Sequence, residues 1–257
     1  MSISSGVALV IGAGSDDGSA VAHLLVRSGC RRLILGDRDV SALEKVVGEC
    51  HHLGDPSLQI ISERCNTNEP SEIDRLIAAG VKEFGEINCC ANCERPRSVE
   101  GRTAETLRTH FVQHTEIWQR GIWLVMRAEI RQFLAQKEKG NLGPCSIVNV
   151  AAAQGLASDR GFPGYCAAAH GIVGMTRATA MDYVAKAIRV NCVCPGPMEP
   201  IDGDAVSIKG SLPPPPIGRY IATAEVAQAV VFLLGDGATA ITGIDLPVDG
   251  GWSLYHH

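Results

Sequence analysis

The sequence predicts an α/β fold: a parallel, doubly wound sheet with helices on both faces, built as a single domain over residues 1–257. Apolar runs of strand length alternate with amphipathic helical segments along the chain, which is the pattern of a parallel sheet joined by helical crossovers. The first run, Val7–Ile11, is apolar at every position, as expected of a strand covered on both faces. No repeat, linker or shift in composition divides the 257 residues, a length that suits one large domain.

The first part of the chain supplies four predicted strands and three helices. Gly12, Gly14 and Gly18 form a glycine-rich turn between the first strand and an amphipathic helix. Ser71 and Asp74 have the spacing of a capping pair, which predicts the start of the third helix. The strands are short apolar runs bounded by polar or turn residues. We expect strands at 7–11, 33–36, 58–62 and 87–91, and helices at 20–28, 41–52 and 71–84.

The second part of the chain supplies three more strands and three helices. A long amphipathic region containing Gly121 predicts a helix over 103–139, and a run of small residues starting at Tyr165 predicts a closely packed helix. Pro195-Gly196-Pro197 breaks the chain, and residues 198–218, with prolines at 213–216, are predicted to be irregular. We expect strands at 146–150, 189–193 and 244–248, and helices at 165–186 and 223–234.

Composition excludes several classes of function. The net charge is −5 and no basic run stands out, which argues against nucleic acid and against an anionic membrane surface as partners. No apolar run approaches the ~18 residues of a membrane span. The first strand follows the N-terminus without a charged leader, so we expect no secretion signal and a cytoplasmic location.

The ten cysteines are predicted to pack as small buried apolar side chains in a reducing compartment. Cys90 and Cys93 form a C-x-x-C pair, but further ligands at matching spacing are missing from the sequence. We therefore predict no metal site.

A strand, a glycine-rich turn and a helix form the Rossmann-like unit that binds dinucleotides. Asp37 lies about twenty residues past the turn, where an acid can hold the adenosine ribose hydroxyls. Asp37 favours NAD, whereas Arg38 is suited to the 2′-phosphate of NADP. The alternative is that Asp37 is only a solvated acid at the end of a strand.

Several motifs together resemble the short-chain dehydrogenase/reductase family over nearly the whole chain. They are the glycine turn, Asn149, Tyr165, the Arg189-Val190-Asn191 run ending in Pro195-Gly196, Ile241-Thr242-Gly243, and Val248-Asp249-Gly250-Gly251. The resemblance implies a seven-stranded sheet, a homodimer or homotetramer, and a substrate pocket roofed by residues 198–218.

Three of the family's four catalytic residues are replaced. The family's asparagine, three residues before Gly121, is Trp118; its serine is Ala152; its lysine, four residues after the tyrosine, is Ala169. Only Tyr165 remains. Without a nearby ammonium, Tyr165 is expected to keep its ordinary pKa of ~10 and to serve as a hydrogen-bond donor rather than a base. The alternative is a tyrosine retained for packing.

The resemblance also indicates a damaged cofactor site. Asp16 replaces the middle glycine of the turn and is followed by Asp17, and two carboxylates there repel a phosphate. The family's asparagine–alanine–glycine loop corresponds to Cys93-Glu94-Arg95. Asn66 takes the place of an aspartate that meets the adenine, and Glu199-Pro200 stand where a threonine is expected. The cofactor residues predicted to remain are Gly12, Gly14, Gly18, Asp37, Arg38, Asn66, Pro195 and Gly196. We expect NAD(P) to bind weakly or to be dispensable.

Trp118, facing Ala152 and Ala169, predicts an aromatic-walled pocket for a largely apolar small molecule. Asp159, in the loop before Tyr165, is a candidate acid or base, or else a solvated loop acid. The preferred hypothesis is a cyclase or isomerase with Diels–Alder-like chemistry, similar to tetrad-poor enzymes of fungal secondary metabolism, with catalysis by proximity and orientation. The alternative is an NAD(P)H-dependent oxidoreductase that reduces an activated C=O, C=N or C=C bond. A third hypothesis is a non-catalytic partner, in which Trp118 only fills space in an inactive site.

Overall fold

The computed structural model describes residues 5–54, 56–96, 98–141, 143–198 and 214–255. Within them, the strands form one parallel 7-stranded sheet in the order β3-β2-β1-β4-β5-β6-β7, which confirms the predicted doubly wound sheet. The strands are β1 Val7–Ile11, β2 Arg32–Asp37, β3 Gln59–Arg64, β4 Cys89–Asn92, β5 Cys145–Val150, β6 Ile188–Pro195 and β7 Asp245–Val248.

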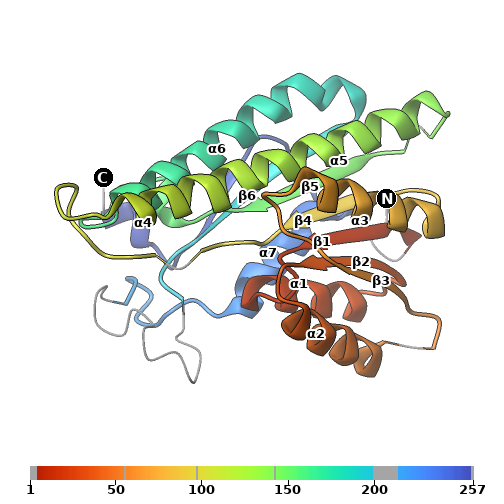
Figure 1. Ribbon diagram of the computed structural model, residues 1–257, viewed down its shortest axis with the longest axis horizontal. Coiled ribbons are helices and arrows are strands. Elements are labelled where there is room, and N and C mark those ends of the chain that lie inside the picture. The colour runs from red at the N-terminus through yellow and green to blue at the C-terminus, as the bar shows by residue number, and fades with distance from the viewer. Residues whose placement is uncertain (1–4, 55, 97, 142, 199–213, 256–257) are drawn as a thin grey trace.

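Helices cover both faces of the sheet (Figure 1). Alternate side chains of β1 point to opposite faces: Leu9 and Ile11 belong to one apolar core, Ala8 and Val10 to the other. The first core lies under α3, α5 and α6, and the second under α1, α2 and α7. The helices are α1 Asp16–Arg27, α2 Val40–Leu53, α3 Pro70–Phe84, α4 Arg108–Val112, α5 Gly121–Glu138, α6 Pro163–Tyr183 and α7 Thr223–Leu234.

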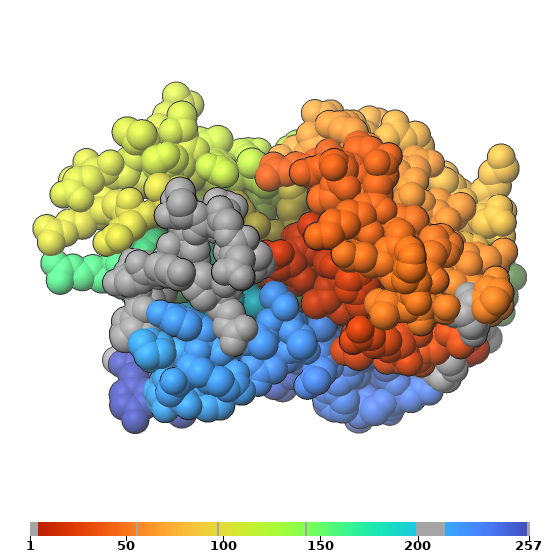
Figure 2. Space-filling model, turned by 90° about the horizontal axis from the view of Figure 1, so that it is seen from below, coloured from red at the N-terminus to blue at the C-terminus, as the bar shows by residue number. Residues whose placement is uncertain are grey.

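The strand order reverses beside β1, and this reversal positions the site. The chain runs outward from β1 to β2 and β3, then returns so that β4 pairs with the other side of β1. Ile11 pairs with Asn92, so the turn after β1 and the loop after β4 leave the sheet side by side. Ligands of open α/β sheets bind at such a switch point. In Figure 2 the red N-terminal segments lie against the blue region of α7, in agreement with the packing of α1 on α7.

Two helix starts differ from the prediction because other residues cap them. α1 begins at Asp16 rather than at residue 20, since the Ser15 side chain accepts a hydrogen bond from the Gly18 N–H at 3.1 Å. The capping pair predicted at Ser71 and Asp74 was wrong. α3 begins at Pro70, whose fixed φ suits the first helical position, and its N-cap residue makes no side-chain cap.

The predicted continuous helix over 103–139 was also wrong in its first half. The helix begins at Arg108, and a π-helical segment, Gln113–Arg120, separates α4 from α5. Thr106 Oγ1 donates to the Gly101 and Arg102 carbonyls, so the chain before α4 is a hydrogen-bonded turn. A π-helical turn is often found at functional sites. This one directs Trp118 and His114 inward, where both are buried.

All ten cysteines are buried and free, as predicted for small apolar side chains. The described residues contain no group of histidine, cysteine or acidic side chains able to hold a metal. No helix among these residues is both long and apolar enough to cross a bilayer. Most of the predicted roof loop, including Glu199 and Pro200, lies outside the described residues. Its end is described: Ile217 N–H donates to the Gly250 carbonyl at 3.0 Å.

Candidate active site

The turn after β1 is closed by two glycines that leave no room for a side chain. Gly12 has φ +72°, and a Cβ there would lie 2.6 Å from the Glu94 backbone nitrogen. A Cβ on Gly18 would lie 2.0 Å from the Gly12 carbonyl oxygen. The glycines that the sequence singled out therefore hold the turn tightly against the loop after β4.

Asp37 ends β2 beside this turn. Its Oδ2 accepts a hydrogen bond from Gly14 N–H at 2.8 Å, and its Oδ1 accepts one from Asp39 N–H at 2.8 Å. Asp37 is only 8% exposed, so it is an ordered group rather than a solvated acid. Its neighbour Arg38 is exposed on the same edge of the sheet.

The two acids at the start of α1 differ in environment. Asp16 is exposed, whereas Asp17 is 3% exposed and pairs with Arg95 at 2.9 Å. Both carboxylates were expected from the sequence to repel a phosphate. The structure shows that a guanidinium from the loop after β4 compensates the charge of Asp17.

β4 ends on Asn92, and Cys93, Glu94 and Arg95 follow in the loop after it, where the sequence predicted the family's asparagine–alanine–glycine loop. Glu94 Oε2 accepts a hydrogen bond from Thr67 Oγ1 at 2.6 Å. Burial raises the pKa of Glu94, while the Thr67 hydrogen bond and the charge of Arg38 oppose that shift. The loop thus places an acid near Asp37, next to the turn.

Tyr165 lies in the first turn of α6 and is 5% exposed. The Trp118 ring lies 4.8 Å away at 38°, and the His114 ring meets it edge-on at 5.5 Å. The Arg95 guanidinium donates a hydrogen bond to its hydroxyl. Burial raises the pKa of Tyr165, and the charge and hydrogen bond of Arg95 offset part of that rise. The expectation of an ordinary pKa without a nearby cation was therefore wrong on both counts.

Trp118 fills space instead of lining an open pocket. It is fully buried, as are Ala152 and Ala169. Its Nε1 has no hydrogen-bond partner among the described residues, so the indole packs as an apolar group. The structure places Trp118 against Tyr165, a contact that the sequence did not predict. The burial of its ring agrees with the alternative in which it occupies the space of missing side chains.

The remaining predicted residues are placed outside the Tyr165 cluster. Asp159 lies before α6, where its backbone N–H is 3.5 Å from Cys166 Sγ, and it makes no described contact with the phenol. Asn66 uses its Oδ1 to accept the Asn68 N–H at 3.2 Å. Pro195 ends β6, and a Cβ on Gly196 would lie 2.7 Å from the Asp249 Cα, so Gly196 is required for packing.

A buried polar network lies directly behind the site. Asn92 Nδ2 donates to Glu129 Oε2 at 3.1 Å and to Asn149 Oδ1 at 2.9 Å, and Asn149 donates to Thr176 at 2.9 Å. Burial raises the pKa of Glu129 to about 7, although hydrogen bonds from Asn92 and Cys90 lower it. Glu129 is 1% exposed, and the sequence analysis missed it. A single glutamate on a helix carries no sequence signal of burial.

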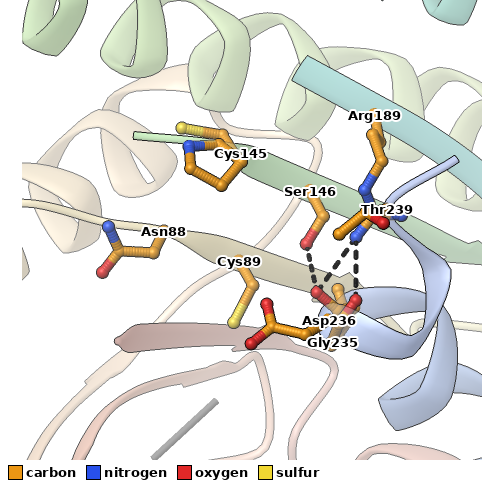
Figure 3. A pocket seen from close by; sticks show the side chains of 10 residues that line it. Asn88, Cys89, Cys145, Ser146, Arg189, Gly235, Asp236 and Thr239 are labelled. Atoms are coloured by element: carbon orange, nitrogen blue, oxygen red, sulfur yellow. Dashed lines mark hydrogen bonds between the residues drawn. The ribbon is translucent and has the colours of Figure 1, made fainter. Parts of the chain in front are cut away.

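A second polar cluster, at the amino ends of β5 and β6, is structural. It surrounds a cavity of about 20 Å³, enough for a single water (Figure 3). Arg189 donates to the Leu233 carbonyl at 2.7 Å and to the Leu234 carbonyl at 3.1 Å, and Ser146 Oγ also donates to Leu234 at 2.9 Å. These bonds satisfy the last carbonyls of α7, as basic side chains do at helix ends.

Comparison with known proteins agrees with this fold. The family model described as enoyl-(acyl carrier protein) reductase matches residues 12–253. Cyclohexanol dehydrogenase of Acinetobacter sp. (strain SE19) is 32% identical over 251 residues, which cover 96% of this chain and 94% of that protein. The short-chain dehydrogenase/reductase aba4 of Botryotinia fuckeliana (strain B05.10) is 30% identical over 258 residues, covering 96% of each chain.

Solved structures show the same likeness. Levodione reductase superposes with a TM-score of 0.87 at 26% identity, covering 97% of this chain and 98% of its own. An actinorhodin polyketide ketoreductase crystallised with NADPH gives a TM-score of 0.84 at 30% identity, covering 98% of both chains. The fold and site define a dinucleotide-type α/β enzyme scaffold. The chain belongs to the short-chain dehydrogenase/reductase family, which confirms the resemblance seen in the sequence, and the fungal relative fits the predicted likeness to fungal members.

Proposed function

We propose that the protein is an NAD(P)H-dependent oxidoreductase that reduces an activated C=O, C=N or C=C bond. The relatives are named as dehydrogenases and reductases, which supports this alternative over the cyclase or isomerase preferred from the sequence. The observation that carries the proposal is the Tyr165 hydroxyl, held by Arg95 beside the glycine turn.

The residues around the turn fit a dinucleotide. Gly12 and Gly18 keep the tight bend that such a turn requires, and the Asp37 carboxylate is held at the end of β2, where it can accept ribose hydroxyls. Asp37 favours NAD over NADP. Arg95 compensates the charge of Asp17, whereas Asp16 places an exposed carboxylate at the position of the turn's middle glycine. We therefore expect binding that is weaker than in a turn with glycine at that position. When bound, the reduced nicotinamide supplies a hydride.

The protein's own contribution is a proton held at the Tyr165 hydroxyl. Because burial raises the pKa of Tyr165, the phenol stays protonated at neutral pH and donates a hydrogen bond to the substrate heteroatom. The Arg95 guanidinium remains charged and stabilises the phenolate if that proton is transferred. The reverse reaction needs a phenolate base, so alcohol oxidation is disfavoured. Ala152 offers no second donor, which restricts substrates to bonds that are already electrophilic.

The full burial of Trp118 removes the open aromatic wall on which the cyclase hypothesis depended. No other contact among the described residues favours a pericyclic reaction. A largely apolar substrate and a homodimer or homotetramer remain predictions.

The test uses NADH and NADPH with a panel of cyclic 1,2-diketones, enones and cyclic iminium ions. Nicotinamide oxidation should depend on a panel member, and Tyr165→Phe should lower kcat/KM by about 10²-fold or more. Tyr255→Phe is the matched control, because Tyr255 is 76% exposed and far from the turn in sequence. Absence of nicotinamide binding at millimolar concentration, measured by its fluorescence, would overturn the proposal.

A further inference from the structure

We infer that Arg95 supplies, from the loop after β4, the cation that the family places on the helix of the catalytic tyrosine, and that Asp17 holds it against Tyr165. The inference rests on the proposed function, because it assigns a positioning role for the proton donor of that reaction. It concerns two residues whose contact with each other the sequence did not predict.

The Arg95 guanidinium is fixed from three sides. One Nη lies 2.9 Å from Asp17 Oδ2 on α1 and 3.0 Å from Met198 Sδ, just after β6. The guanidinium also donates a hydrogen bond to the Tyr165 hydroxyl on α6. The Arg95 side chain is 21% exposed and that of Asp17 is 4% exposed, so most of the pair is shielded from water. A shielded charge-assisted hydrogen bond orients its partner more firmly than an exposed one.

Helix α6 carries Ala169 at the position of the family's lysine, and this alanine is fully buried. The Trp118 ring packs over Tyr165 at 4.8 Å. The cation beside Tyr165 comes instead from the loop after β4, which carries Arg95.

The charges around Tyr165 give the pair a defined effect. The groups that face it are Arg95 from the loop after β4, Asp17 from α1, Cys166 from α6 and His114 from the π-helical segment. Burial raises the pKa of Tyr165 most, Arg95 lowers it, and Asp17 raises it again. Burial lowers the pKa of Arg95, but Asp17 and Tyr165 raise it and the net direction is upward, so the guanidinium does not exchange its proton at neutral pH. Arg95 therefore orients and stabilises the donor without donating a proton itself.

The experiment measures the ionisation of Tyr165 directly. Tyrosine is replaced biosynthetically by 3,5-difluorotyrosine, whose phenol titrates near neutrality, and the ¹⁹F resonance of residue 165 is assigned by its loss in Tyr165→Phe. Titrations are compared for the wild type, Arg95→Met, Arg95→Lys and Asp17→Asn. Arg160→Met, which removes an exposed arginine, is the control. Thermal unfolding confirms that each variant is folded.

We expect Arg95→Met to raise the midpoint of residue 165 by about one pH unit or more, the effect of losing an adjacent opposite charge. Arg95→Lys should recover most of that shift, and Asp17→Asn should raise the midpoint or broaden the resonance, because Arg95 loses its anchor. An unchanged midpoint in folded Arg95→Met would overturn the inference. If Arg95→Met fails to fold, an Asp17→Asn spectrum identical to wild type overturns it. Because the readout needs no substrate, it can succeed even if the reductase proposal fails, and the two failures are distinguishable.

Discussion

Glu129 should make folding stability fall as the pH rises from about 4.5 to about 7. The native state keeps this buried carboxyl protonated up to a pKa of about 7, whereas in the unfolded chain it ionises near 4.5. Between these values the native state binds more protons, so raising the pH favours unfolding. This difference between the native and unfolded pKa values of Glu129 corresponds to about 3 kcal/mol of folding free energy, at roughly 1.36 kcal/mol per pH unit. This contribution is fully present below the unfolded pKa and is lost as the pH rises through the folded pKa.

Urea unfolding between pH 5 and 8, for the wild type, Glu129→Gln and Glu138→Gln, measures this effect. Glutamine keeps the shape and an acceptor for Asn92 but cannot ionise, so the Glu129→Gln protein should lack this part of the pH dependence. Glu138 is exposed on the same helix and should leave the slope unchanged when replaced. Parallel stability curves for the wild type and Glu129→Gln would show that Glu129 is not a protonated core residue and would refute the reasoning.

Three further predictions concern packing at the site. Trp118→Ala should cost about 3–5 kcal/mol in urea unfolding, because it empties a fully buried space; a loss under about 1 kcal/mol would indicate an open pocket wall instead. Ala169→Lys should destabilise the folded protein by several kcal/mol, because it buries a charge in a filled space, and it should not increase NADH turnover. Ala167→Lys, at an exposed position of the same helix, should leave stability nearly unchanged. Equal melting temperatures for the two variants would contradict this prediction. Gly18→Ala should abolish NADH binding and lower the melting temperature, because its Cβ would meet the Gly12 carbonyl oxygen at 2.0 Å. Gly174→Ala is the control, because a Cβ there has open space and should be tolerated. Retained NADH binding in Gly18→Ala would count against the turn as the dinucleotide site.

Local patterns predicted the framework of this protein well. The fully apolar Val7–Ile11 run gave the first buried strand, and the glycine spacing placed the turn and the start of α1 within a few residues. These features depend on neighbours close in sequence, whose chemistry a pattern records directly. The π-helical segment escaped prediction because it is a local change of backbone hydrogen bonding within a helix, which the apolar pattern does not record.

The site was predicted only in part, because its contacts join residues that are far apart in sequence. Arg95 and Asp17 are 78 positions apart, and Glu129 and Asn92 are 37 apart. Residue by residue, Asp17 and Arg95 look like two defects in a cofactor motif; brought together they form an ion pair against Tyr165. The contact of Trp118 with Tyr165 and the burial of its ring depend on the packing of α6, which the spacing does not record.

The most direct test of the central claim is isotope transfer from deuterated cofactor. NADH and NADPH carrying deuterium at C4 of the nicotinamide are incubated with the protein and the panel of diketones, enones and iminium ions, and the products are analysed by mass spectrometry. We predict deuterium at the reduced carbon, with a rate that falls about 10²-fold or more in Tyr165→Phe. Product that forms at the same rate without nicotinamide, and without deuterium, would contradict the claim.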